Sequence, residues 1–269
     1  MNIEELENKA KKIRNNIINQ VYNAKSGHPG GSLSSADILT ALYFNEMNIN
    51  PNEPKSNLRD RFILSKGHAA PVLYATLAEK GFFEKEKLLN LRKIDSCLQG
   101  HPDMNKVPGV DMTTGSLGQG LSAANGMAIA AKLDNLDYRV YCLLGDGEIE
   151  EGQVWEAAMT ASHYKLDNLC VIVDNNNLQI DGTIDKIMNS YPIDKKFESF
   201  GFNVINIDGH NMEEVLKAFE IAKTTKEKPT AIIAKTVKGK GISFMENQVG
   251  WHGKALNETE YENAILELN

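Results

Sequence analysis

The second half of the chain alternates short apolar runs with segments of helical periodicity. Residues 138–144 and 169–173 are apolar and β-prone, and residues 151–164 between them repeat apolar side chains at helical spacing. The same alternation continues with 202–207 and 230–234 as apolar runs and 212–223 as a helix. This pattern favours an α/β fold, in which a parallel β-sheet carries helices on both faces.

The first half predicts mainly helices. Residues 3–23 place apolar side chains at spacings of three and four, which is typical of an amphipathic helix. Residues 26–31 contain three glycines and a proline and favour a loop, and we expect a second helix after it with Ser34 or Ser35 as its cap. The other elements expected are a polar loop at 48–60, a short buried strand at 61–65, a helix at 69–80 ended by Gly81, and an acidic surface helix at 257–269.

Composition and charge narrow the classes of protein to which the chain can belong. Its 269 residues fit one large α/β domain, and no repeat or low-complexity linker divides them, so we expect residues 1–269 to form a single domain. Asp and Glu total 36 against 29 Lys and Arg, and this net charge of −7 argues against a basic surface for nucleic acid. Small anionic ligands remain compatible with it, because dipoles and metal ions act locally.

The chain also lacks the marks of membrane insertion and of secretion. It has no apolar run of about 18 residues, and its charged start, MNIEELENKAKK, lacks the apolar centre of a signal peptide. Cys97, Cys142 and Cys170 form no CxxC pair, and the last two lie in apolar runs, which predicts that these two are buried free thiols. We therefore expect a cytoplasmic protein that does not bind membranes.

Polar residues suited to metal binding follow two of the expected strands. Gly145-Asp146-Gly147 comes directly after one strand, and Asn176 follows the next strand, thirty residues after Asp146 (176 minus 146). One βαβ crossover spans that distance, so neighbouring parallel strands would bring both side chains to one crevice. Carboxylate, amide and carbonyl oxygens suit Mg²⁺, and a helix start after Gly147 would add N–H donors for a diphosphate. For Gly-Asp-Gly alone, a plain turn with Asp as a helix cap is an equal alternative.

These residues resemble the binding motif of thiamine diphosphate enzymes, in which an Asn-containing loop follows Gly-Asp-Gly after just under thirty residues. Further segments resemble those of transketolases, in the same order along the chain: Ser26–Gly30 (SGHPG), Ser65–Ala69 (SKGHA), Gly100–Pro102 (GHP) and Thr114–Gly120 (TGSLGQG). The resemblance runs from about residue 5 to about residue 255. It implies that the chain is the N-terminal, diphosphate-binding half of a transketolase.

The resemblance implies roles for individual residues around the cofactor. Asp146 and Asn176 would bind Mg²⁺ through their side chains, and Leu178 would bind it through its carbonyl oxygen. The residues implied to contact thiamine diphosphate are Gly145 and Gly147 at the diphosphate, Gly115 and Leu117 on the aminopyrimidine side, and Glu151 and Glu156, which match carboxylates of a buried network between paired active sites.

Four histidines are the implied catalytic residues. His28, His68, His101 and His252 would line the substrate channel, bind sugar hydroxyls and assist proton transfers. Each stands beside a glycine, which is more typical of loops than of packed helix faces. A neutral imidazole both donates and accepts, which suits polyol recognition near pH 7, although any one of them could be only a loop hydrogen-bonder.

Two other features are expected to be structural. His210 lies just before a helix and is expected to order its start, and His163 lies within a helix. The Lys- and Gly-rich run 235–241 lacks the spacing of a Walker motif and is expected to form a mobile basic loop. That loop, with Lys238 and Lys240, would be able to reach a substrate or the cofactor phosphate.

The resemblance also implies a partner chain. No segment resembles the pyrimidine-binding domain, whose glutamate promotes cofactor ionisation, so we expect that domain on a separate C-terminal subunit, with two copies of each chain forming a heterotetramer. The implied reaction transfers a two-carbon ketol unit from a ketose phosphate to an aldose phosphate through the thiamine diphosphate ylid.

The alternatives are a split transketolase for a sulfosugar or branched sugar, and a 2-oxoacid dehydrogenase α-subunit, which should lack the histidine set. A deoxyxylulose-phosphate synthase fits SGHPG and GHP less well, and a non-catalytic scaffold subunit should have damaged motifs.

Overall fold

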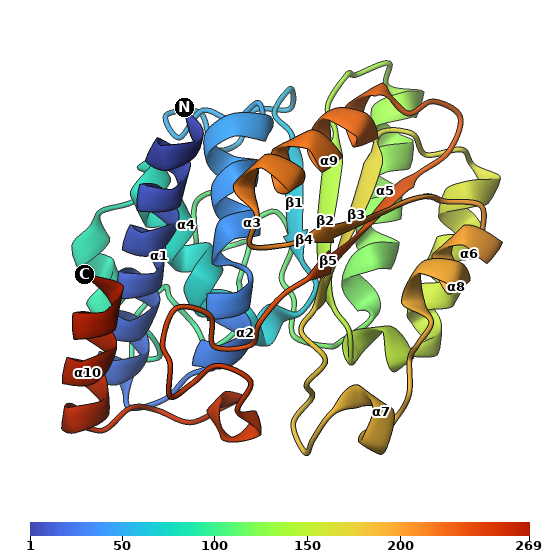
Figure 1. Ribbon diagram of the computed structural model, residues 1–269. Coiled ribbons are helices and arrows are strands. Elements are labelled where there is room, and N and C mark those ends of the chain that lie inside the picture. The colour runs from blue at the N-terminus through green and yellow to red at the C-terminus, as the bar shows by residue number, and fades with distance from the viewer.

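A five-stranded parallel β-sheet organises the molecule, as seen in a computed structural model that describes residues 1–269 (Figure 1). The strand order is β1-β2-β3-β5-β4, and every neighbouring pair is parallel. The strands are β1 (Arg61–Leu64), β2 (Val140–Gly145), β3 (Leu169–Asn175), β4 (Asn203–Asp208) and β5 (Thr230–Lys235). The expected α/β class and all five expected strands are confirmed.

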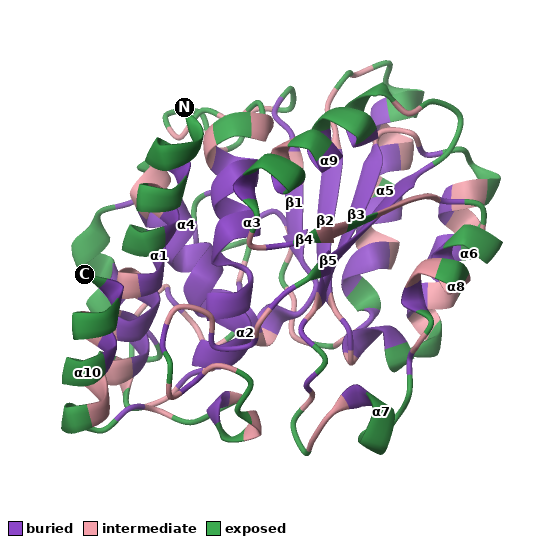
Figure 2. Ribbon diagram, in the orientation of Figure 1, coloured by how far each residue is buried: buried purple, intermediate pink, exposed green.

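Both faces of the sheet are buried, because side chains alternate between two apolar clusters. On β2, Tyr141 and Leu143 enter one cluster, while Val140, Cys142 and Leu144 enter the other. The sheet and the inner sides of the flanking helices are therefore the most buried part of the molecule (Figure 2). This explains why the strand sequences are continuous apolar runs rather than alternating ones.

The helices fall into two layers, and the direction of each crossover decides the layer (Figure 1). The connections through β1, β2, β3 and on to β4 run one way across the sheet, whereas the step from β4 to β5 runs back. Right-handed crossovers must then place the β4–β5 helix on the opposite face. One layer holds α1 (Ile3–Ala24), α2 (Pro29–Ser34), α3 (Ala36–Ala41), α4 (Ala70–Lys80) and α9 (Met212–Thr224), with α10 (Glu258–Leu268) outside α1; the other holds α5 (Gln119–Leu133), α6 (Gly152–His163) and α8 (Ile193–Ser199). The short α7 (Ile184–Ile187) projects at the carboxyl ends of the strands.

The structure differs from the expectations for the first half in two details. The run 26–31 is not wholly a loop, because α2 begins at Pro29, a residue that suits the first helical position since its missing N–H needs no partner there. Ser35 is the N-cap residue of α3, as expected, but neither its side chain nor that of Ser34 makes a capping hydrogen bond. Their hydroxyls instead donate to the carbonyl of Gly31 and to the carboxylate of Asp174.

Helix α5 had no counterpart in the periodicity analysis. It is built largely of Ala and Gly, so it shows no stripe of large apolar residues, although Leu121, Ala124 and Ala128 are buried in the cluster behind the sheet. The expected end of α4 is confirmed, because Gly81 adopts the left-handed conformation at φ 96°.

The cysteines carry no disulfide, and Cys142 and Cys170 are buried as expected. No helix has both the length and the apolar character needed to span a membrane.

Candidate active site at the carboxyl ends of the strands

The loops after β2 and β3 bring together three oxygen ligands, which we call the oxygen set: the side-chain oxygens of Asp146 and Asn176 and the backbone carbonyl oxygen of Leu178. The two strands pair in register up to Gly145 and Asp174, so Asp146 and Asn176 emerge side by side at the same edge. The N–H of Asn177 donates to Asp146 Oδ2 at 2.5 Å, and the N–H of Leu178 donates to Asn176 Oδ1 at 3.1 Å. The juxtaposition expected from one βαβ crossover is therefore confirmed.

This oxygen set fits a hard divalent cation. Asp146 is only 2% exposed, and its burial together with the nearby Asp174 carboxylate raises its pKa to about 7. Burial and the Asp174 charge outweigh the attraction of Asp146 to Lys238, so a bound cation would stabilise this carboxylate further. No three His, Cys, Asp or Glu side chains are arranged so that they could hold a metal ion, so a cation here would rely on amide and carbonyl oxygens and on its other ligands.

Gly147 does not present a free helix N-terminus. Its N–H donates to Asp146 Oδ1 at 2.9 Å, and a 3₁₀ turn at Glu148–Glu150 separates it from α6, which begins at Gly152. A helix does follow Gly147 as expected, but the chain makes this tight turn before α6 begins.

A buried ion pair lies beneath the oxygen set, and sequence reasoning missed it. Lys66 Nζ donates to Asp174 Oδ2 at 2.5 Å and to the carbonyl of Gly31 at 2.7 Å. Asp174 also accepts from Asn176 Nδ2 at 3.2 Å and from the hydroxyl of Thr236. Because the amide nitrogen of Asn176 is bound in this way, its oxygen is the atom that faces the loop of Leu178.

Lys238 is buried against the same loop, which corrects the expectation of a mobile basic loop. Its side chain is 2% exposed, and Nζ donates to the carbonyl of Leu178 at 3.1 Å and to His252 Nδ1 at 2.9 Å. Burial lowers the pKa of Lys238 to about 8, while the Asp146 carboxylate acts in the opposite direction. An ammonium group thus stands between the oxygen set and the histidines.

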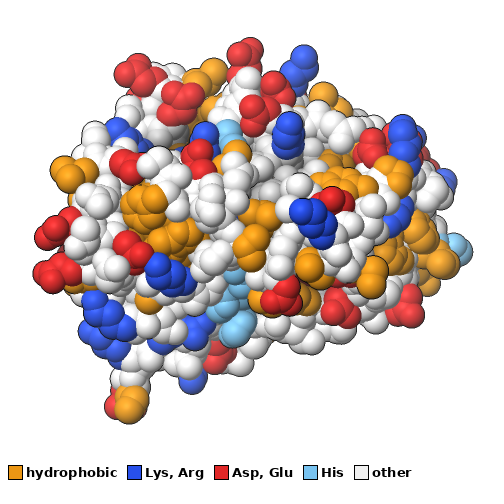
Figure 3. Space-filling view, turned by 60° about the horizontal axis from the view of Figure 1, so that its bottom comes forward, with side chains coloured by type: hydrophobic (Ala, Val, Ile, Leu, Met, Phe, Trp, Pro, Cys, Tyr) orange, Lys and Arg blue, Asp and Glu red, His pale blue; other side chains and the backbone are white.

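Three of the four predicted histidines form a compact trio. The ring centroids of His28 and His68 are 5.4 Å apart, those of His28 and His252 are 5.4 Å apart, and those of His68 and His252 are 5.2 Å apart. Histidine side chains are visible on the face formed by the carboxyl ends of the strands (Figure 3). His252, which lies far along the chain from the other two, is therefore an integral part of the group.

All three rings are neutral near pH 7. Burial, followed by nearby positive groups, lowers the pKa of His28 to about 4 and that of His252 to about 3, and it holds the pKa of His68 well below its usual range. The buried Nδ1 of His28 has no hydrogen-bond partner. Neutral rings with a free nitrogen are suited to binding hydroxyl groups and to accepting or donating protons.

His101 lies at the rim of this region and not in the trio. It is exposed, and its ring packs beside Gly115, where an added Cβ would lie 3.1 Å from His101 Cδ2. Arg92 is an exposed cation nearby, and its charge contributes to lowering the pKa of both His28 and His101. Sequence reasoning did not find Arg92, which stands eight residues before Gly100 in a turn (100 minus 92).

Gly115 and Leu117 lie in the segment that enters α5, and close packing holds this segment against the 65–68 turn. An added Cβ at Gly67 would lie 2.7 Å from the nitrogen of Gly115. Leu117 is half-buried, and the N–H of the following Gly118 donates to Glu148 Oε1 at 3.0 Å.

The glutamate that is buried beside this segment is Glu148, which sequence reasoning did not single out. It also accepts from the N–H of Gly145 at 2.9 Å and from the hydroxyl of Ser65 at 2.5 Å. Glu151 and Glu156, which were expected to contribute to the cofactor site, are exposed on the surface of this chain.

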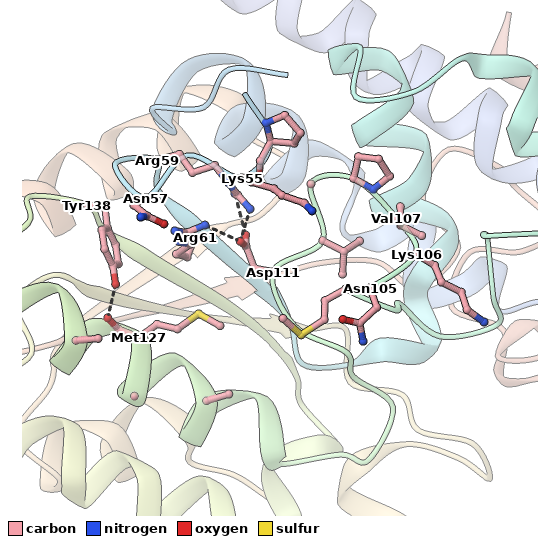
Figure 4. A pocket seen from close by; sticks show the side chains of 18 residues that line it. Lys55, Asn57, Arg59, Arg61, Asn105, Lys106, Val107, Asp111, Met127 and Tyr138 are labelled. Carbon is pink, nitrogen blue, oxygen red and sulfur yellow. Dashed lines mark hydrogen bonds and ion pairs between the residues drawn. The ribbon is translucent and has the colours of Figure 1, made fainter. Parts of the chain in front are cut away.

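A cleft of about 940 Å³ lies elsewhere and is not the candidate active site. It lies between α5 and the 104–111 loop, beside the start of β1 (Figure 4). Its wall is organised by Asp111, which binds both Arg59 and Arg61, while Tyr138 donates to the carbonyl of Met127. In these pairs the charged and polar groups of the wall bind one another, and they hold the loop against the sheet edge.

Comparisons with known proteins agree with this geometry. The family described as "Transketolase, thiamine diphosphate binding domain" matches residues 6–268. A protein from Phocaeicola vulgatus that is named as one subunit of an apulose-4-phosphate transketolase is 44% identical, and the match covers 100% of this chain and 95% of that protein. A protein named 6-deoxy-6-sulfo-D-fructose transketolase subunit SqwG, from Clostridium sp. strain MSTE9, is 46% identical over 98% of this chain and 96% of its own.

Single-chain transketolases match over part of their length. Human transketolase is 48% identical, and the match covers 99% of this chain but 42% of the human protein. The crystal structure of transketolase from Campylobacter jejuni superposes with a TM-score of 0.94 at 39% identity, covering all of this chain and 43% of that one. The chain therefore belongs to the transketolase family and carries its thiamine diphosphate-binding domain.

Proposed function

We propose that this chain is the cofactor-binding subunit of a two-subunit transketolase. The reaction is the transfer of a two-carbon ketol unit from a ketose phosphate to an aldose phosphate. One observation carries the proposal: Lys238 joins the oxygen set to the histidine trio, through the carbonyl of Leu178 and the ring of His252. A diphosphate-metal site and a polyol-binding site thus share one buried edge.

Asp146, Asn176 and the carbonyl of Leu178 would hold Mg²⁺, and the ammonium group of Lys238 would complement a diphosphate beside it. The raised pKa of Asp146 and the lowered pKa of Lys238 support this assignment, because burial disfavours the charge on each group and a magnesium diphosphate would stabilise both charges. Thiamine diphosphate, once bound, supplies the nucleophilic carbon for the reaction. The backbone of Gly115, Leu117 and Gly147 would line the remainder of the cofactor.

The histidines would handle the substrate. His28, His68 and His252 are neutral, so each ring can accept one hydrogen bond and donate another to a sugar hydroxyl. His252 accepts from Lys238 through Nδ1, which leaves its Nε2–H as a donor. His101 and Arg92 are exposed at the rim, where they would meet the more distant part of a sugar phosphate.

A partner subunit would complete the active site and carry the pyrimidine-binding domain. Two relatives that match this chain over 95% and 96% of their length are named as subunits, and single-chain transketolases are more than twice as long as the matched part. Exposed apolar side chains beside the Leu178 loop, those of Ile180, Ile187 and Met188, offer a docking surface next to the site. A heterotetramer with two copies of each chain, and residence in the cytoplasm, complete the proposal, and Glu151 and Glu156 would then face the assembled interface.

The identity of the sugar is a second question. Relatives of similar length are named for apulose 4-phosphate and for 6-deoxy-6-sulfo-D-fructose, which favours a non-standard sugar as the specific alternative to the pentose phosphates. The neutral histidine trio suits any of these polyols, because its rings can form hydrogen bonds with hydroxyl groups. We therefore assign the reaction type to this chain and leave the choice among sugars to assay.

The test is to purify the tagged chain gently from its native cell and to identify what co-elutes. The eluate is assayed with thiamine diphosphate and Mg²⁺, first with xylulose 5-phosphate and ribose 5-phosphate and then with the two alternative sugars. A second subunit with ketol transfer supports the proposal, whereas a lone chain that turns over the sugars overturns the need for a partner. Asp146→Ala should abolish Mg²⁺-dependent cofactor binding in the complex, while Asp181→Ala, an exposed carboxylate in the same loop, should not. Equal binding by both variants would contradict the metal assignment.

A further inference from the structure

His210 is fixed between two partners that demand opposite hydrogen-bonding roles from its ring. Its Nδ1 lies 2.7 Å from Asp37 Oδ2, and its Nε2 accepts the N–H of Val237 at 2.8 Å. A backbone N–H can only donate and a carboxylate can only accept. The ring must therefore be neutral, with its proton on Nδ1.

Asp37 fixes the hydrogen bond to His210 firmly, because Arg14 also binds its carboxylate. Arg14, on α1, donates from Nη1 to Asp37 Oδ1 at 2.9 Å and from Nη2 to Oδ2 at 2.5 Å. Burial acts to raise the pKa of Asp37, but Arg14 and His210 together outweigh it and bring that pKa down to about 2. The carboxylate thus stays charged and keeps accepting from the imidazole.

The loop that carries His210 is built to approach the end of β5 closely. Gly209 donates its N–H to the carbonyl of Lys235 at 2.8 Å, and an added Cβ there would lie 2.6 Å from Thr236 Cγ2. Asp208 Oδ1 accepts the N–H of His210 at 2.9 Å. The expected role of His210 in starting α9 was wrong, because Asn211 provides that cap by accepting from the N–H groups of Glu213 and Glu214.

The segment that His210 holds, residues 236–239, is the turn that delivers Lys238. Val237 precedes Lys238 directly, and the N–H of Gly239 donates to the carbonyl of Gly30 at 3.0 Å, next to the histidine trio. The anchors of Thr236 also hold the turn, as does the N–H of Asn247, which donates to the carbonyl of Lys238 at 2.9 Å. The Val237 N–H to His210 is the contact that holds the turn on the α3 side.

We propose that His210, as the neutral Nδ1–H tautomer, is a positioning residue for the cofactor site. It holds the 236–239 turn so that Lys238 stays seated between Leu178 and His252. The role of Lys238 toward the cofactor rests on the proposed function, whereas the tautomer and the anchoring of the turn do not. Without the imidazole, the Val237 N–H loses its acceptor, and we expect cofactor affinity to fall about fivefold, the order of one net hydrogen bond.

The first test needs no variant. In ¹⁵N NMR spectra of the full chain at pH 7, the His210 ring should show a protonated Nδ1 and an unprotonated Nε2, which is the less common tautomer of free histidine. A ring protonated on Nε2, or on both nitrogens, would overturn the proposal.

The second test compares two neighbouring variants. His210→Ala should speed hydrogen exchange of the Val237 amide and weaken thiamine diphosphate binding to the co-purified complex. Asn211→Ala removes only the cap of α9 and should lower Tm without either effect. His210→Gln offers an acceptor near the Nε2 position and should restore part of the protection and affinity. If His210→Ala left both the exchange and the affinity unchanged, or if Asn211→Ala matched it, the positioning role would be refuted. If the wild-type complex bound no thiamine diphosphate, the proposed function would fail, and exchange at Val237 would still decide whether His210 anchors the turn.

Discussion

The buried pair of Lys66 and Asp174 allows a quantitative prediction about what holds the site together. The two side chains are 2% and 0% exposed, and Nζ lies 2.5 Å from Oδ2. Burial works to raise the pKa of Asp174, yet Lys66 and the hydroxyl donors overcome it and lower the pKa below its usual range. Each charge therefore depends on the other.

Removing one partner should be costly, and removing both should cost less than the sum. Asp174→Asn leaves the Lys66 ammonium buried with only neutral acceptors, such as the carbonyl of Gly31, and we expect a loss of about 3 to 5 kcal/mol in the free energy of unfolding. Lys66→Met should cost about 2 to 4 kcal/mol, because hydroxyl and amide donors still bind the carboxylate. The double variant leaves neither member of this pair as an unpaired buried charge, so the coupling should reach about 2 kcal/mol.

The assay is urea unfolding of all four proteins at pH 7 with chelator present. A matched control is the exposed pair of Lys195 and Glu198, which lie 2.9 Å apart with side chains 65% and 45% exposed. Its double-mutant cycle should give a coupling below about 0.5 kcal/mol. Additivity at Lys66 and Asp174 within about 0.5 kcal/mol would refute the reasoning, since it would mean that neither charge relies on the other.

Three further predictions concern pH, packing and assembly. The folded pKa of His28, about 4, lies below its ordinary value of 6.5, so the unfolded chain binds more protons and stability should fall as pH drops from 6.5 toward 4. His28→Asn should reduce that loss of stability by about 1 to 2 kcal/mol after allowance for solvent screening. Thermal melts of the two proteins that change in parallel with pH would contradict this. Gly67→Ala places a Cβ 2.7 Å from the backbone nitrogen of Gly115 and should lower the free energy of unfolding by about 1 to 3 kcal/mol. Gly126→Ala, within helix α5 and with open space around the added Cβ, should raise it slightly. Urea unfolding that ranks the two variants the other way would count against the packing argument. Ile187→Glu, on the exposed apolar surface beside the site, should leave Tm unchanged but reduce co-purification of the partner subunit, and an unchanged yield of partner would argue against docking there.

The sequence by itself determined the architecture and one half of the candidate site. Apolar runs of strand length, separated by helical periodicity, were sufficient to place five strands, because both faces of a parallel sheet must be apolar. The thirty residues from Asp146 to Asn176 span one crossover, so their meeting at one edge also followed from local pattern and chain geometry. Where the pattern was weak, as in the Ala- and Gly-rich α5, the element was missed.

The tertiary structure alone decided which side chains support that site. Lys66 and Asp174 are 108 residues apart, Ser34 reaches Asp174 across 140 residues, and His210 reaches Asp37 across 173. Such contacts produce no periodic pattern in the sequence. Each of these polar residues would also fit an exposed loop, and only the fold shows that it is buried. Lys238 is the clearest case: in the sequence it belongs to a basic, glycine-rich run typical of a mobile surface loop. Burial against Leu178 and His252 turned it into a fixed charge, because a desolvated ammonium must keep its hydrogen-bond acceptors.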